Sequence, residues 1–198
     1  ALTTAYGYAW IMLYTRVGLK DSESIYMLGA RGGVSSAALQ IAKSIGCVVY
    51  AGSGSDQKLK RLEALGANYG VNTSKNKEFH RTIRGMTDGA GVDVVVNYTG
   101  GETWVRSLKT LRHGGRLLTC GATIGFDPPT DIRYIWRKEM DIRGSDGWRR
   151  SDLVSLINAV SSGVIKPIID KVLPLEKTAE GHRLLEEREV FGKVIIQP

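Results

Sequence analysis

The sequence predicts an α/β fold built on a doubly wound parallel sheet of six strands, and three observations lead to it. Short apolar segments alternate along the chain with segments that show helical periodicity. The apolar segments are apolar on both faces, as strands are when helices cover both sides of a sheet. Glycine is abundant at 24 residues and proline scarce at 5, which suits tight strand–helix turns. This alternating order predicts parallel strands joined by crossover helices.

The strands follow one another in the order expected for such a sheet. Each is a short apolar segment bounded by glycine or polar residues, and the predicted ranges are 25–31, 47–52, 69–73, 92–98, 115–121 and 140–146. The first helix carries an apolar stripe of Val34, Ala38, Ile41 and Ile45, and Gly46 ends it. Further stripes predict helices over 59–65, 79–86 and 104–111, and a helical segment precedes the sixth strand.

The last third of the chain reads as a helix followed by a strand–helix–strand segment. Ser151 is the predicted N-cap of a helix with an apolar stripe, and Gly163 ends it. Strands are predicted over 168–175 and 192–198, with a helix over 177–189 between them. If these tail strands normally meet another domain, we expect them to expose apolar surface in this chain.

Composition limits the functional classes. A length of 198 residues suits one domain, and no apolar segment is long enough to span a membrane. The net charge of +7 is compatible with a nucleic acid or with a phosphate-bearing ligand. Acidic residues interrupt the densest basic region, 131–150, so a solvated face or a subunit contact is favoured over a nucleic-acid groove. Cys47 and Cys120 lie in separate apolar segments, which indicates reduced thiols and a cytoplasmic location.

The glycine-rich segment Gly29–Ser36, "GARGGVSS", follows the first predicted strand and opens the first predicted helix. Backbone N–H groups and the helix dipole at such a point favour a pyrophosphate. Gly32 and Gly33 allow close approach of the phosphates, and Ser35, which stands where a third glycine is usual, could donate its hydroxyl to one. The alternative is an ordinary strand–helix turn that binds nothing.

The end of the second strand bears on which nucleotide would bind. NAD sites place Asp or Glu there to bond the ribose 2′-hydroxyl, but this chain has Ser53, and Asp56 reads as a helix cap. Ser53 and Ser55 with Lys58 suit a 2′-phosphate, and Arg31 could add positive charge. The sequence therefore favours NADP(H) over NAD(H).

The fourth and fifth strands end in glycine-containing turns that would meet at the same edge of the sheet. Ligands of doubly wound sheets lie across the carboxyl ends of the strands. The residues expected to line this crevice are Tyr98, Thr99, Gly100, Gly121, Ala122 and Thr123. His80, His113 and His182 are isolated and are interpreted as structural, so no catalytic residue and no metal ligand is proposed from the sequence.

Five segments together resemble the medium-chain dehydrogenase/reductase superfamily, which contains zinc-type alcohol dehydrogenases and zinc-free quinone and enoyl reductases. They are "GARGGVSSAALQIAKSIGCVVYAGS", "LEALGA", "GVDVVVNYTGG", "GGRLLTCGATIGF" and "LLEEREVFGKVIIQP". The resemblance runs the whole length of the chain. It implies a two-domain enzyme in which a GroES-like catalytic domain precedes a Rossmann domain. Residues 1–198 would be the cofactor-binding Rossmann domain, with 165–198 a return segment that packs on the catalytic domain.

The resemblance also implies roles for individual residues. The loop positions of the family fall on Ala30, Gly32, Gly33, Val34 and Ser35, with Val34 behind the nicotinamide ring and Thr4 near it. Ser53 falls on the position that selects NAD or NADP, with Lys58 beside it, whereas Thr73 replaces a tyrosine of NADP-using quinone reductases. The zinc ligands of the family lie outside this chain. The edge of the sixth strand, near 134–146, would form a homodimer contact.

The expected function is that of the cofactor-binding half of an NADP(H)-dependent, alcohol dehydrogenase-like oxidoreductase. It would transfer hydride to or from a small carbonyl or alcohol, a chemistry that belongs to the nicotinamide. A zinc-free quinone or enoyl reductase is the alternative within the same class. A non-catalytic nucleotide- or RNA-binding module is the alternative from another class, although nucleic acid is not the expected partner.

Overall fold

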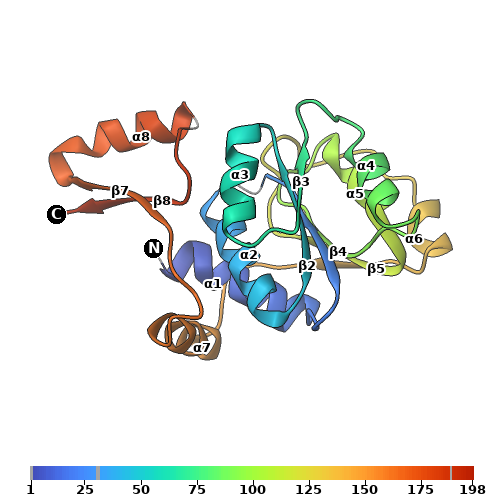
Figure 1. The fold of residues 1–198 in the computed structure, drawn as a ribbon, viewed down its shortest axis with the longest axis horizontal. Helices are drawn as coiled ribbons and strands as arrows, with labels where there is room; N and C mark the ends of the chain where they lie inside the picture. Colours follow the sequence, from blue (N-terminus) through green and yellow to red (C-terminus); the bar gives the residue numbers. More distant parts are fainter. Residues whose placement is uncertain (1, 30–31, 188) are drawn as a thin grey trace.

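The computed structural model describes residues 2–29, 32–187 and 189–198. Its main sheet has six parallel strands in the order β3-β2-β1-β4-β5-β6 (Figure 1). The strands are β1 (Ser24–Met27), β2 (Val48–Ser53), β3 (Tyr69–Asn72), β4 (Val92–Val96), β5 (Leu111–Thr119) and β6 (Asp141–Gly144). The predicted doubly wound sheet is confirmed. The strand order reverses between β1 and β4, which opens a crevice at their carboxyl ends.

Helices cover both faces of this sheet and divide the core into two clusters. Alternation along β1 shows the division, since Ile25 and Met27 pack in one cluster and Tyr26 in the other. The first cluster includes α2 (Gly33–Ile45) and α3 (Asp56–Ala64), and the second α4 (Phe79–Met86) and α5 (Thr103–Thr110). The short helix α6 (Arg133–Arg137) precedes β6. Burial on both sides explains why the strands read as continuously apolar.

A helical segment that the sequence analysis did not predict opens the described chain. It runs from Leu2 to Val17 as η1 (Leu2–Tyr6), α1 (Gly7–Trp10) and η2 (Ile11–Val17), with π-helical geometry in the first and last parts. It ends at Gly18, whose φ of 60° is a left-handed conformation. Tyr6, Met12 and Leu13 are fully buried in the first cluster. The threonines and the glycine near its start are weak helix formers, so helix propensity does not predict this segment.

The predicted cap of α7 (Arg150–Ser161) is wrong. The N-cap is Arg149 rather than Ser151, and the Asp152 carboxylate accepts the Arg149 backbone N–H at 2.9 Å. Asp152 also accepts the Thr15 hydroxyl at 3.0 Å, which ties α7 to the N-terminal helical segment. The local capping box between Arg149 and Asp152 therefore marks where α7 begins. β5 begins at Leu111 instead of residue 115, because Leu111 already pairs with Val92 of β4.

The tail forms a separate unit of β7 (Ile169–Pro174), η3 (Leu175–Lys177), α8 (Thr178–Glu186) and β8 (Lys193–Gln197). β7 and β8 pair in parallel with each other and stand apart from the main sheet (Figure 1). Apolar side chains of this unit are exposed, as expected for the tail: Ile169, Val172, Leu175 and Leu185. None of the described helices is both long and apolar enough to cross a membrane.

Candidate functional site

The glycine-rich turn joins the buried end of β1 to the first turn of α2, as predicted. Gly29 has a φ of 57°, a left-handed conformation in which a side chain is strained, and Gly32 is the N-cap of α2. Ala30 and Arg31, both proposed as cofactor contacts, lie outside the described residues. α2 has 13 residues and is therefore long enough to have a full helix dipole. The positive end of this dipole and the N-terminal N–H groups lie at the glycine-rich turn.

Ser35 does not present its hydroxyl to a ligand, which overturns its expected role as a phosphate donor. The residue is 1% exposed, and its Oγ lies 3.1 Å from the carbonyl oxygen of Gly29. Its Oγ also contacts the Tyr98 hydroxyl, which in turn donates to the carbonyl of Leu28. Tyr98 therefore turns its hydroxyl into the turn, and only its ring is left for the crevice. Burial raises the pKa of this phenol, so it stays protonated.

A cavity of about 530 Å³ opens at the carboxyl ends of β1, β2 and β4. Ser53, the last residue of β2, lines it and is only 2% exposed. The Ser53 Oγ has no hydrogen-bond partner among the described residues, although buried hydroxyls almost always have one. Tyr98, Thr99 and Thr123 line the same cavity, as predicted. A buried, unpartnered hydroxyl beside a cavity is the signature expected of a group that bonds to a ligand.

Two cations in this cavity were missed by the sequence analysis. Lys77, in the loop after β3, and Arg106, on α5, both belong to its lining. Arg106 is bonded to Glu78 at 3.1 Å and to Glu102 at 3.2 Å, so those carboxylates neutralise part of the charge. Neither cation sits in a motif, because the segments that carry them meet only when the sheet forms. The predicted Lys58 lies half-buried on α3, has an interaction partner and is not among the described residues that line the cavity.

Lys193, the first residue of β8, is a further residue that the sequence analysis missed. A Cβ built on Gly33 would lie 2.6 Å from the Lys193 Cδ, so the lysine stem rests on this glycine. The same Cβ would lie 3.1 Å from the Cβ of Ala5. The stem of Lys193 therefore lies against the first residue of α2. The sequence signal for this residue was a glycine followed by a lysine near the C-terminus. Only the fold shows that this lysine lies against Gly33.

The remaining predicted residues are Gly100, Gly121, Ala122, Val34 and Thr4. Gly100, Gly121 and Ala122 line a smaller, adjoining cavity of about 350 Å³ beneath the loop that follows β5. A Cβ on Gly100 would lie 2.3 Å from the carbonyl oxygen of Gly125, so this position accepts only glycine. Val34 is half-buried on the first turn of α2, and Thr4 is exposed on η1, next to the residue that touches Gly33.

Histidine and cysteine contribute no reactive group that the structure identifies. His80 is buried with its Nδ1 3.6 Å from the Glu78 carboxylate, and burial lowers its pKa. His113 and His182 are exposed. Burial raises the pKa of the Cys47 and Cys120 thiols to about 11, which leaves them protonated. Within residues 2–29, 32–187 and 189–198, no three metal-ligating side chains are grouped to hold a metal ion.

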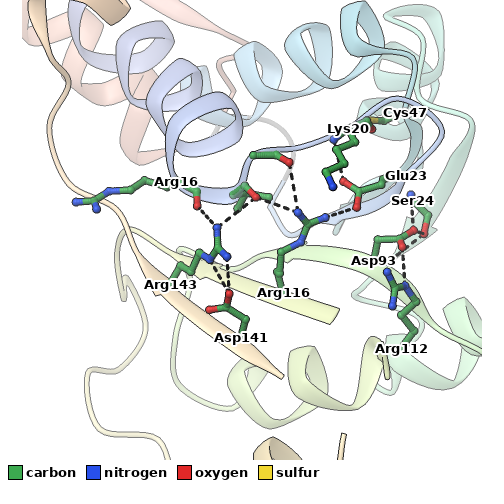
Figure 2. Close-up of polar contacts among 12 residues, drawn as sticks. Arg16, Lys20, Glu23, Ser24, Cys47, Asp93, Arg112, Arg116, Asp141 and Arg143 are labelled. Carbon is green, nitrogen blue, oxygen red and sulfur yellow. Dashed lines mark hydrogen bonds and ion pairs between the residues drawn. The ribbon is translucent and has the colours of Figure 1, made fainter. Parts of the chain in front are cut away.

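A large polar network lies at the opposite, amino-terminal edge of the sheet (Figure 2). Asp93 accepts the Ser24 N–H at 2.7 Å and the Arg112 guanidinium at 2.6 Å. Burial alone would raise the pKa of Asp93, but these hydrogen bonds outweigh it and hold that pKa below its ordinary value. Arg116 pairs with Glu23 and donates to the carbonyl of Val17 at 2.9 Å, where η2 ends. The network joins strand starts to a helix end, so it is structural.

A family model described as "Zinc-binding dehydrogenase" matches residues 33–162. The chain belongs to the zinc-binding dehydrogenase family. Among curated relatives, the acryloyl-coenzyme A reductase of Sulfurisphaera tokodaii is 29% identical over 91% of this chain and 52% of its own length. The chain thus spans about half the length of the curated dehydrogenases and reductases that it matches.

Two solved structures extend this similarity to the fold. An NAD-dependent alcohol dehydrogenase superposes with a TM-score of 0.92 at 38% identity, over 98% of this chain and 56% of that one. The 2-octenoyl-CoA carboxylase reductase CinF, solved with NADP and 2-octenoyl-CoA, superposes with a TM-score of 0.88 at 28% identity, over 97% of this chain and 47% of that one. The zinc-binding dehydrogenase chain therefore has the cofactor-binding fold of NAD(P)-dependent oxidoreductases.

Proposed function

We propose that this chain is the cofactor-binding half of an NADP(H)-dependent oxidoreductase that transfers hydride to or from a small carbonyl or alcohol. The observation that carries the choice of NADP(H) is Ser53. Its buried hydroxyl has no partner among the described residues and borders a cavity that also contains Lys77 and Arg106. The last residue of β2 is this serine and not an aspartate or glutamate. A carboxylate at that position would bond a ribose 2′-hydroxyl and repel a 2′-phosphate.

In this proposal each part of the cofactor has a defined place. The diphosphate lies at the N-terminus of α2, over Gly32 and Gly33, with the Lys193 ammonium beside it. The adenosine occupies the cavity bordered by Ser53 and Thr99. The nicotinamide lies toward the carboxyl ends of β4 and β5, and the remaining predicted contacts surround it: Thr4, Val34, Gly100, Gly121, Ala122 and Thr123. The nicotinamide supplies the hydride chemistry, and the chain binds and orients it.

Reduction of an activated alkene is the second candidate. Relatives named as acryloyl-coenzyme A and crotonyl-CoA reductases support it, as does a structural neighbour solved with 2-octenoyl-CoA. The two candidates share the same cofactor half and differ in the substrate. Because the chain spans about half of these relatives, substrate choice would belong to the part of those proteins that this chain does not cover. Activity of a two-domain protein on an alcohol and on an enoyl thioester would separate the candidates.

Two association surfaces belong to the same proposal. The exposed apolar residues of the β7–α8–β8 unit would pack on a preceding catalytic domain. The free edge of β6 would pair with a second copy, and Trp136 and Ile142 near it are 61% and 36% exposed.

The decisive experiment is a titration of the 198-residue chain with NADPH and with NADH, followed by cofactor fluorescence. We expect NADPH to bind more tightly, and Ser53→Asp to shift the ratio of the two dissociation constants toward NADH by roughly tenfold or more, because a carboxylate repels the 2′-phosphate. Ser151→Asp, which adds the same charge on the exposed start of α7, is the matched control. Tighter binding of NADH by the unmodified chain would refute the choice of NADP(H), and binding of neither would refute the proposed function.

A further inference from the structure

Gln40, on α2, bonds through both atoms of its side-chain amide to a single residue of the tail. The Lys166 N–H donates to the Gln40 Oε1 at 2.8 Å, and the Gln40 Nε2 donates to the Lys166 carbonyl at 3.0 Å. The side-chain amide thus pairs with the N–H and the C=O of one residue, as a residue of a neighbouring strand would. It attaches the segment after α7 to the helix whose N-terminus borders the glycine-rich turn.

A second attachment follows two residues later. The hydroxyl of Tyr6 accepts the Ile168 backbone N–H at 2.8 Å, and Tyr6 is fully buried on η1. Burial raises the pKa of Tyr6, so the phenol stays neutral and keeps its acceptor role across the ordinary pH range. Together Gln40 and Tyr6 hold residues 166–168 against the first core cluster.

The attached segment in turn positions Lys193. The Lys193 N–H donates to the carbonyl of Ile168 at 3.1 Å, and Gly192 forms an isolated parallel bridge with Gly32 in the glycine-rich turn. Gly192 has a φ of 105°, and a Cβ there would lie 2.6 Å from the Ile168 carbonyl oxygen, so the backbones meet as closely as glycine allows. A path of hydrogen bonds therefore leads from Gln40 to the lysine that rests on Gly33.

We propose that Gln40 is a positioning residue for cofactor binding, which it supports by holding the tail so that Lys193 lies beside the diphosphate. The inference rests on the proposed function. The tail unit stands apart from the main sheet (Figure 1), and Phe191, two residues before Lys193, also helps to place β8 because it is buried in the first core cluster. Arg61 of α3 adds another contact, with its guanidinium 3.9 Å from the ring centroid of Phe191. The Arg61 guanidinium also lies 3.7 Å from the Asp170 carboxylate, so Arg61 contacts β7 and the residues before β8. Gln40 instead bonds to Lys166, in the segment that precedes β7 and ends at Ile168, whose carbonyl accepts the Lys193 N–H.

The test is a double-mutant cycle on the 198-residue chain with two probes, NADPH and adenosine 2′-monophosphate, which lacks the diphosphate bridge. We expect Lys193→Met to weaken NADPH binding about tenfold, as loss of a charged contact does, and to leave adenosine 2′-monophosphate unchanged. Gln40→Leu should weaken NADPH about three- to tenfold with the same selectivity, and should add less than about twofold in a Lys193→Met background. Both variants should reduce the salt dependence of NADPH binding, because the ammonium no longer faces the diphosphate.

Two matched controls isolate the effect. Lys171→Met removes an exposed lysine from β7, in the same tail unit. Ser44→Ala removes a hydroxyl that donates to the Ile41 carbonyl within α2, one turn after Gln40. Both should bind NADPH as the unmodified chain does. If Gln40 served only the stability of α2, Gln40→Leu would weaken both probes alike or add in full to Lys193→Met, and either result overturns the proposal.

Hydrogen exchange tests the same path without a cofactor. In Gln40→Leu we expect faster exchange at the amides of Lys166, Ile168 and Lys193, with the amides of β1 and β4 unchanged. Unchanged exchange at Lys193 would overturn the inference even if cofactor binding were weakened. Failure of the unmodified chain to bind NADPH and NADH would instead refute the proposed function, so the two failures are distinguishable.

Discussion

Substitution of Gly33 by alanine separates cofactor binding from stability. The new Cβ would lie 2.6 Å from the Lys193 Cδ, which is too close, but a lysine stem is flexible and can move away. It would lie 3.1 Å from the Ala5 Cβ, which requires a shift of a few tenths of an ångström. We therefore expect the Lys193 ammonium to leave the N-terminus of α2 while the fold is retained.

The magnitudes follow from these contacts. Loss of one charged hydrogen bond costs about 1.5 to 3 kcal/mol, so Gly33→Ala should weaken NADPH binding by at least about tenfold. Within α2, replacing glycine by alanine contributes about 0.5 to 1 kcal/mol, which offsets the small strain at Ala5. The free energy of unfolding should therefore change by less than about 1 kcal/mol, a shift in Tm of at most about 4 °C.

The assay pairs fluorescence titration with urea denaturation, and Gly85 of α4 provides the control. A Cβ on Gly85 meets nothing within 4 Å, so Gly85→Ala should raise the free energy of unfolding by about 0.5 to 1 kcal/mol and leave cofactor binding unchanged. If Gly33→Ala bound NADPH normally, Lys193 would not face the diphosphate. If it lost several kcal/mol of stability, the assumption that Lys193 yields would be wrong.

Two further predictions concern buried polar contacts. Tyr98→Phe removes the donor to the Leu28 carbonyl and should lower the free energy of unfolding by about 1 to 3 kcal/mol in urea denaturation, whereas no change would mean that water replaces the hydroxyl. Asp93→Asn removes a carboxylate whose pKa is held below the ordinary value, so the carboxylate stabilises the fold above about pH 4 and this contribution is lost as pH falls through the folded pKa. The free energy of unfolding of the variant should therefore be lower than that of the unmodified chain by about 1 to 3 kcal/mol at pH 7. Thermal denaturation should show a smaller difference at pH 3. A difference that is the same at both pH values would contradict this explanation.

The strand–helix order was predictable because its signals are local. Apolar segments between glycines gave the six strands of the main sheet, with ends that differ by a few residues. The N-terminal helical segment was missed, since its first residues have weak helix propensity and its stability comes from burial of Tyr6 and Leu13. The cap at Ser151 was wrong for a different reason, because the Asp152 carboxylate caps the Arg149 N–H and α7 begins at Arg150.

By itself, the sequence determined that a glycine-rich turn joins β1 to α2 and that Ser53, rather than an acid, ends β2. Both are statements about neighbouring residues, and local pattern carries them. Only the tertiary structure decided that Ser35 bonds to Tyr98, that Lys77 and Arg106 share a cavity, and that Lys193 rests on Gly33. These residues are far apart in the chain, and their distances depend on how strands pair and how the tail docks. The physical reason is that a docked contact depends on all the packing between its two partners, which no short segment encodes.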